Sequence, residues 1–272
     1  MPDSKLANAP LGHEVTYPKK YDAGLLFPIT RAANRQTLQK IPAWSGEDIW
    51  NAYEISWLTP KGKPLVCMGR FTFAHDSVNL IESKSFKLYL NSFNEERFDS
   101  AKHVQEIMQR DLSEAAQSNV VVELFPASMP NSSAPLQGRN IDGADIEITT
   151  YKPAPELLRC TAGGDAVTET LTSDLLKSNC PVTGQPDWGS LQIRYTGPRI
   201  DTEALLAYIV SLRQHNEFHE HCVEKMYCDI WNACRPTSLF VYARYTRRGG
   251  LDINPWRASG PVPVSQVRTP RQ

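Results

Sequence analysis

The chain has 272 residues, of which 41% are hydrophobic and 22% charged, and its formal net charge at neutral pH is -1. This composition predicts a packed globular core and excludes a disordered chain. A net charge so close to zero argues against a protein that binds nucleic acid polymer by neutralising many phosphates. Any nucleobase that the protein handles is therefore expected to be a small molecule.

No segment of the sequence predicts export or insertion into a membrane. The first five residues are polar, and the longest apolar run, 204–210, is too short to span a bilayer. The six cysteines are spread over a chain too large to need disulfide bonds, so we expect reduced thiols. These features predict a cytoplasmic protein with neither a membrane nor a nucleic acid polymer as partner.

Taken in chain order, the first half predicts strands and two helices. Residues 1–45 are rich in proline, lysine and short polar side chains, and regular structure is expected to begin after them. Aromatic and branched residues on both sides of a turn-rich spacer predict a hairpin, and apolar spacing with a serine cap predicts the helices. The expected elements are strands at 49–58, 65–73, 120–125 and 146–151 and helices at 79–90 and 101–116, the second capped by Ser100.

The second half repeats this order after a connection at 126–143 that is rich in proline, serine, asparagine and glycine. Asp201 can cap a helix that ends at Leu212, and Glu203 holds a place before an apolar helix similar to that of Glu82. The remaining expected elements are strands at 191–195 and 239–245 and a helix at 217–233. We predict an α+β protein of two similar units, 1–135 and 136–272.

Residues 178–189, Ser-Asn-Cys-Pro-Val-Thr-Gly-Gln-Pro-Asp-Trp-Gly, combine one thiol and one acid. A glycine and two prolines between Cys180 and Asp187 predict an irregular, turn-rich loop. A thiolate that attacks and an acid that supplies a proton suit covalent catalysis, so both side chains are candidate catalytic residues. The alternative is a loop cysteine that lies near an aspartate without a chemical role.

Two stretches together resemble a known family. Residues 82–89, Glu-Ser-Lys-Ser-Phe-Lys-Leu-Tyr, are similar to the signature of the NADPH-dependent nitrile reductases of queuosine biosynthesis, the 7-cyano-7-deazaguanine reductases. Residues 178–189 are similar to the catalytic loop of that family, and 218–222 and 247–255 also fit it. Because the first signature and the cysteine lie in different halves, the chain resembles the longer, two-module branch of the family.

The resemblance implies tandem tunnelling-fold (T-fold) units, each an antiparallel sheet backed by two helices, and a homodimer. It implies that NADPH reduces the nitrile of 7-cyano-7-deazaguanine to a primary amine, for queuosine modification of tRNA. The implied intermediate is a thioimide on Cys180, with Asp187 as the proton donor. The remaining implied site residues are Ile81, Glu82, Ser83, His219 and Glu220 for the substrate and Ser83, Lys84, Arg248 and Gly249 for the cofactor.

The residue types suit the implied roles. A carboxylate such as Glu82 or Glu220 can accept the ring N–H and exocyclic NH2 of a deazaguanine in a bidentate way. Lys84 and Arg248 are cations of the kind that bind the additional phosphate of NADPH. A proton-donating Asp187 needs a raised pKa to act near neutral pH. No G-x-G-x-x-G segment follows a predicted strand, so the cofactor rests on the resemblance alone.

Two other classes of protein remain open. A zinc-dependent enzyme similar to the T-fold cyclohydrolases is one, although cysteines six residues apart do not all share one helical face. The other is a T-fold protein that binds a purine-like ligand without turning it over, which needs neither a nucleophile nor an acid. The side chains that suggest zinc crowd one segment: His219, His221, Cys222, Cys228 and Cys234.

Overall fold

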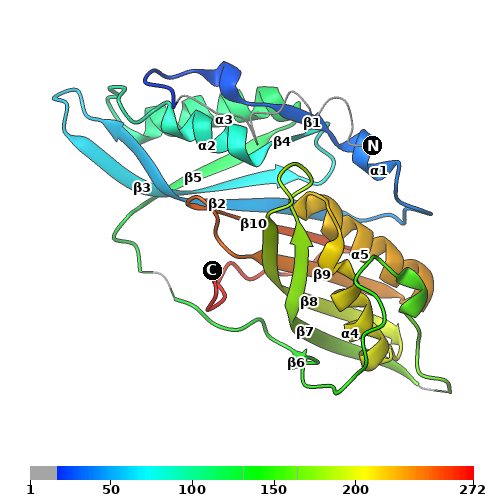
Figure 1. The fold of residues 1–272 in the computed structure, drawn as a ribbon. Coiled ribbons are helices and arrows are strands. Elements are labelled where there is room, and N and C mark those ends of the chain that lie inside the picture. The colour runs from blue at the N-terminus through cyan, green and yellow to red at the C-terminus, as the bar shows by residue number, and fades with distance from the viewer. Residues whose placement is uncertain (1–16, 131, 164) are drawn as a thin grey trace. The chain divides into compact units, whose positions relative to one another are not determined.

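The computed structural model describes residues 17–130, 132–163 and 165–272 (Figure 1). These residues divide into two compact units. The first unit comprises the described parts of 1–35 together with 48–130 and 247–252, and the second comprises 36–47, 253–272 and the described parts of 131–246. Each unit combines helices with a sheet, so the protein is a mixed α and β structure.

The sheet of the first unit has the strand order β5-β3-β2. Its strands are β2 (Ser45–Leu58), β3 (Pro64–Ala74) and β5 (Val120–Pro126). The turn between β2 and β3 is closed by the N–H of Thr59, which donates to the carbonyl of Lys63. The predicted hairpin is therefore confirmed in its position. The short strand β1 (Pro28–Thr30) pairs antiparallel with β4 (Asn79–Ile81).

The prediction that regular structure begins after residue 45 is wrong. The 3-10 turn η2 (Ala23–Leu25), the strand β1 and the short helix α1 (Arg31–Arg35) all precede it. Residues 1–16, on which part of this prediction falls, lie outside the described residues. The early elements form because their backbone pairs with distant segments such as β4, which local sequence does not reveal.

The helices of the first unit are α2 (Ser83–Asn91) and α3 (Ala101–Ala116). Ser100 caps α3 as predicted, because its side chain accepts the N–H of His103. The prediction for 79–90 is wrong at its start, since 79–81 form β4 and Glu82 is the N-cap of α2. Helix α2 packs through Phe86, whose ring makes edge contacts with Trp50 and Phe71.

The second unit has the strand order β10-β9-β8-β7-β6. The strands are β6 (Arg139–Asn140), β7 (Ala166–Asn179), β8 (Pro186–Pro198), β9 (Ser238–Tyr245) and β10 (Leu251–Ala258). Neighbours pair antiparallel except for β6, which runs parallel to β7. The register of β7 against β8 shifts at a bulge between Ser173 and Leu176. Strands β7 and β10 were not predicted, and the strand expected at 146–151 is absent from the described residues.

Helices α4 (Thr202–Ser211) and α5 (His219–Cys234) contribute to the core of the second unit, which also includes the 3-10 turns η3 (Pro155–Leu157) and η4 (Leu212–Gln214). Asp201 caps α4 by accepting the N–H groups of Glu203 and Ala204, as its position predicts. The cap that corresponds to Glu82 is thus Asp201, and the expected match between Glu82 and Glu203 is wrong. The core joins helix and strand side chains, among them Leu176, Ile193, Leu205, Tyr208, Met226, Ile230 and Val241.

No helix within the described ranges is long and apolar enough to cross a membrane.

Candidate active site

Cys180 is the first residue after β7 and opens the turn that leads to β8. Its N–H donates to the carbonyl of Gln185 at 2.9 Å, and its carbonyl accepts the N–H of Gly184 at 2.9 Å. Gly184 has a φ of +67°, a left-handed conformation that glycine adopts without steric cost. The expected irregular loop is therefore shorter than 178–189, and a tight turn over 180–185 holds a thiol that is only 4% exposed.

Asp187 lies on β8 rather than in the loop, opposite Ser178 of β7. Its side chain is buried, and its Oδ1 lies 3.5 Å from Nε2 of His219. The His219 ring stands edge-on to Tyr245 with a centroid separation of 4.2 Å. The strand pairing and the aromatic contact thus fix an acid and an imidazole close to hydrogen-bond distance from each other.

Backbone hydrogen bonds join the end of β7 to the start of α5. The N–H of Asn179 donates to the carbonyl of His215 at 2.8 Å, and the N–H of Glu217 donates to the carbonyl of Asn179 at 3.0 Å. Asn179 directly precedes Cys180, and Glu217 lies two residues before His219. The thiol and the first turn of α5 are therefore attached to one another through the main chain.

One buried carboxyl group lies in the first turn of α5, and a partly buried one precedes the helix. Glu220 is 3% exposed, and it lies where free N–H groups of a helix favour a negative charge. Glu217 precedes the helix, and its Oε1 accepts the N–H of Phe218 at 3.0 Å. Burial, followed by the charges of Glu220 and Glu224, raises the pKa of Glu217 to about 7.

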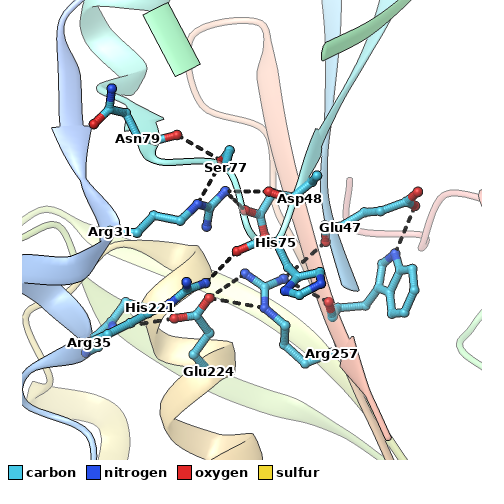
Figure 2. A network of polar contacts seen from close by, with 12 residues as sticks. Arg31, Arg35, Glu47, Asp48, His75, Ser77, Asn79, His221, Glu224 and Arg257 are labelled. Atoms are coloured by element: carbon cyan, nitrogen blue, oxygen red, sulfur yellow. Dashed lines mark hydrogen bonds and ion pairs between the residues drawn. The ribbon is translucent and has the colours of Figure 1, made fainter. Parts of the chain in front are cut away.

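Glu224, one turn further along α5, is neutralised by an arginine (Figure 2). Its Oε1 accepts Nε–H and Nη2–H of Arg257 at 3.1 and 2.7 Å. His221 lies beside this ion pair, with Nδ1 at 4.0 Å from Oε2 of Glu224 and Nε2 at 3.0 Å from Oγ1 of Thr37. Because all three charged or titratable side chains are buried, the ion pair anchors α5 inside its own unit.

The first unit contains the other predicted carboxylate. Glu82 is fully buried and caps α2, with Oε1 accepting the N–H of Lys84 at 2.8 Å and Oε2 that of Ser85 at 2.7 Å. Desolvation raises its pKa, although these bonds and the nearby lysines act in the opposite direction. Each carboxylate oxygen has two lone pairs, so the two capping bonds use only part of the capacity of Glu82 to accept hydrogen bonds. Ile81 and Ser83 flank it on β4 and α2.

A separate buried ion pair organises the chain before β2. Arg31 contacts Oδ2 of Asp48 through Nη2 at 2.5 Å and donates from Nε to Oγ of Ser77 at 2.9 Å (Figure 2). The Ser77 hydroxyl in turn donates to the carbonyl of Asn79. This cluster lies inside the first unit and ties α1 to the loop before β4, so its role is in folding.

An open pocket of about 280 Å³ lies in the first unit beside α2. Lys84 and Lys87, one helical turn apart, line it together with Gly249 and Gly250. A Cβ at Gly249 would meet the Lys87 side chain at 3.3–3.4 Å, and the positive φ of this residue also favours glycine. Of the predicted cofactor residues, Lys84 and Gly249 meet here. Ser83 and Arg248 are not among the described residues that line it.

The structure therefore groups the predicted residues by unit. Cys180, Asp187, His219 and Glu220 belong to the second unit, and the predicted residues of the first unit are Ile81, Glu82, Ser83, Lys84, Arg248 and Gly249. The sequence prediction missed Glu217, although a carboxyl three residues before Glu220 was a usable signal. It also missed Lys87, which the spacing of three residues from Lys84 could have indicated.

The comparisons with known proteins identify the class. Residues 17–124 match the family model described as "Nitrile reductase, 7-cyano-7-deazaguanine-reductase N-term", and residues 186–262 match the model described as "QueF-like protein". The first of these descriptions defines the class as nitrile reductases. The second match covers β8, α4, α5, β9 and β10, and with them Asp187, His219 and Glu220.

Full-length relatives identify the family. A protein from Bordetella pertussis named NADPH-dependent 7-cyano-7-deazaguanine reductase is 58% identical over 272 residues, which cover 98% of this chain and 99% of the relative. One of the same name from Chromohalobacter salexigens is 53% identical over 278 residues, which cover 99% of each. The chain therefore belongs to the family of NADPH-dependent 7-cyano-7-deazaguanine reductases.

The solved structure of an archaeosine synthase described as QueF-Like, in the apo form, is 19% identical, with a TM-score of 0.31 over 36% of this chain and 96% of that chain. The alternative of a zinc-dependent hydrolase is not favoured by the family. Within the described residues, no group of three or more His, Cys, Asp or Glu side chains is arranged to hold a metal ion.

Proposed function

We propose that this protein reduces the nitrile of 7-cyano-7-deazaguanine to a primary amine with hydrides from NADPH, in the pathway that supplies queuosine to tRNA. The observation that carries the proposal is the arrangement at the end of β7. A buried thiol on a tight turn is attached through the main chain to a helix whose first turn presents His219 and Glu220, with Asp187 next to the histidine. The full-length relatives carry the corresponding name.

The buried carboxylates are proposed to bind the base. A deazaguanine presents a ring N–H and an exocyclic NH2 side by side, and a carboxylate accepts both in a bidentate way. Glu220 suits this role because it is buried and lies at a helix N-terminus. Glu82, with Ile81 and Ser83 beside it, is the second carboxylate proposed to bind the base, and His219 assists in fixing the substrate.

The covalent step adds the Cys180 thiol across the nitrile. Sulfur bonds to the nitrile carbon, one C–N π bond is lost, and a proton passes to nitrogen, so that a neutral thioimide forms with no change in oxidation state. Asp187 is the proposed donor of that proton. Its hydrogen-bond-range contact with His219 gives it a neighbour through which the proton can be replaced.

Reduction then needs two hydrides and one further proton: a hydride at the thioimide carbon expels the Cys180 thiolate and leaves an imine, and a hydride at the imine carbon together with a proton on its nitrogen gives the amine. NADPH supplies each hydride when it is bound. The residues proposed to hold it are Ser83, Lys84, Arg248 and Gly249. The pocket beside α2 supports this assignment, because two lysines and two glycines with positive φ offer cations and close backbone approach to phosphates.

The finer architecture is part of the same proposal. We infer two tandem T-fold modules, 1–135 and 136–272, each an antiparallel sheet backed by two helices, and a homodimer as the assembly. The antiparallel pairing of β7, β8, β9 and β10 and the two helices α4 and α5 support this inference for the second module. Size measurement in solution by light scattering tests the dimer.

The deciding experiment is the intact mass of the protein after mixing with 7-cyano-7-deazaguanine in the absence of NADPH. We expect one addition that maps to the peptide containing Cys180. Cys180→Ala should form no adduct and lose turnover by about 10⁴-fold or more, because no other nucleophile replaces it. Cys160→Ala is the matched control and should behave like the parent protein.

Absence of an adduct on reduced, accessible Cys180 would contradict the reductase. In that case binding of the nitrile without turnover would favour a purine-binding protein, and stoichiometric zinc in the purified protein would favour a hydrolase.

A further inference from the structure

Glu217 has surroundings that the proposed mechanism does not use. Its side chain is 18% exposed, and its Oε2 lies 3.7 Å from Nε2 of His221, which is 2% exposed. Its Oε1 is hydrogen-bonded to the N–H of Phe218, the N-cap of α5. Its own N–H binds the residue that precedes Cys180. Glu217 thus touches both the helix that presents Glu220 and the strand that presents the thiol.

Three carboxyl groups occupy this end of α5, and they are not equivalent. Glu224 has Arg257 as its partner, which donates two N–H groups to its Oε1. Glu220 and Glu217 lie three residues apart, and the charge of each opposes ionisation of the other. If Glu220 accepts N–H groups of a base, it must be the ionised member of this pair. The proton that the pair retains then belongs on Glu217.

We propose that Glu217 is a positioning residue whose neutral carboxyl group holds the first turn of α5 in place. Glu217 takes up a proton when a deazaguanine base binds to Glu220. This inference rests on the proposed function, because it assumes that Glu220 is a base-binding carboxylate. A bound base covers the first turn of α5 and removes water from Glu217, and burial disfavours the charged form of a carboxyl. Binding of the base and protonation of Glu217 are therefore linked.

The sign of this linkage follows from the direction of the pKa shift. In the free protein burial raises the pKa of Glu217 to about 7, so the group is largely ionised above neutral pH. Ligand binding raises this pKa further, and proton uptake is therefore expected at pH 7.5 and absent near pH 5.5. The titratable and charged groups that face this cluster are Glu220, His221, Cys222 and Glu224 of α5 and, through Glu224, Arg257 of β10, with the Thr37 hydroxyl beside His221.

The test is calorimetric titration of the Cys180→Ala protein with 7-cyano-7-deazaguanine in buffers of different ionisation enthalpy. The slope of the observed binding enthalpy against the ionisation enthalpy of the buffer gives the number of protons that the protein takes up on binding. At pH 7.5 we expect Glu217 to take up about half a proton or more on binding. Adding the Glu217→Gln substitution to the Cys180→Ala protein should remove this uptake. Glu203→Gln, at the first turn of α4, is the matched control and should leave the uptake unchanged.

Two outcomes separate this inference from the proposed function. If the Cys180→Ala protein binds no nitrile at any pH, the proposed function fails. If it binds, but the proton number is the same with and without Glu217→Gln, the inference about Glu217 is overturned. Should Glu217→Gln fold poorly, the titration without this substitution decides: equal uptake at pH 5.5 and 7.5 contradicts the inference, and uptake confined to pH 7.5 supports it.

Discussion

Helices α2 and α4 begin with the same capping geometry in different surroundings. In each, one acidic side chain before the helix accepts two backbone N–H groups of the first turn, through Glu82 in α2 and Asp201 in α4. Glu82 is fully buried, and desolvation raises its pKa. Asp201 is 26% exposed and has Arg159 at 2.8 Å. Although desolvation acts to raise the pKa of Asp201, the backbone and Arg159 hydrogen bonds keep it below its usual value.

The comparison separates a cap that serves stability from one that costs stability. A half-buried aspartate with a cationic partner is favourable in the folded state at neutral pH. A buried glutamate whose pKa is raised is unfavourable there, and carboxyl groups with such a shift are typical of functional sites. Glu82 is therefore the cap expected to act on a ligand, and Asp201 the cap expected to act only on its helix.

The pockets beside the two helices differ in the charges that line them. The pocket of the first unit carries two lysines from α2 and one carboxylate, Glu54. A pocket of about 410 Å³ in the second unit, next to α4, carries Asp145, Glu147 and Glu203 with Arg159 as its cation. Phosphate groups are bound by cations and repelled by carboxylates, so the pocket beside α2, in which lysines outnumber the carboxylate, suits a phosphorylated cofactor better than the pocket beside α4.

The largest difference between the two caps is expected in catalysis. Glu82→Gln removes the charge that accepts the base, and a hydrogen bond to a charged group contributes about 1.5–3 kcal/mol. We expect kcat/KM for the nitrile to fall about 10- to 100-fold in steady-state assays. Asp201→Asn is the matched control and should change kcat/KM less than about twofold. Equal losses in both variants would contradict the distinction between the caps.

A smaller difference is expected in cofactor binding. Lys84→Ala removes one cation from the pocket beside α2, and we expect KM for NADPH to rise about 10-fold, with less effect on the KM of the nitrile. The effect should shrink at high salt, because screening weakens contacts between exposed charges. Glu203→Ala beside α4 is the control. A Lys84 variant with an unchanged KM for NADPH would place the cofactor elsewhere.

The smallest difference is expected in stability. Asp201→Ala removes a helix cap and should lower the free energy of unfolding by about 1 kcal/mol at pH 7 in urea titrations. Because the pKa of Asp201 is lowered on folding, its contribution is present above about pH 4 and is lost as the pH falls through the lower, folded-state value. The deficit of the variant should therefore shrink in acid. A deficit independent of pH would show that the charge of Asp201 plays no part.

Helices were predictable where a cap and an apolar face coincide. Ser100 and Asp201 are residues of the kinds that cap helices most often, and both mark the starts of the observed helices. The sequence predicts Glu82 inside a helix, because glutamate is an uncommon cap and the strand before it is apolar as well. The boundary at α2 is set by β4, which forms only by pairing with β1.

Strands β7 and β10, the two longest of the unpredicted strands, depend on tertiary partners. Strand β10 is buried along its whole length but contains charged residues, so it lacks the alternation expected of a strand. Its Asp252 accepts hydrogen bonds from Asn51 and Tyr53, and its Arg257 binds Glu224. None of these partners is near β10 in the sequence. Of the candidate site, the thiol and acid were identifiable from local spacing, but the placement of Asp187 on a strand was not, because β7 was missing from the prediction.

The bulge in β7 determines on which face of the sheet the thiol emerges. Ser173 pairs with Leu191 and Leu176 with Gly189, so β7 holds one residue more than β8 over this interval. Side chains alternate between faces along a strand, and the additional residue reverses the parity of every position that follows it. Ser173 and Cys180 differ by an odd number of positions in the sequence, yet both are buried. A regular ladder over the same residues would turn the end of β7, and the motif with it, to the opposite face of the sheet from Asp187. Deletion of the one additional residue would restore a regular ladder and keep the end of β7 on the face of Asp187.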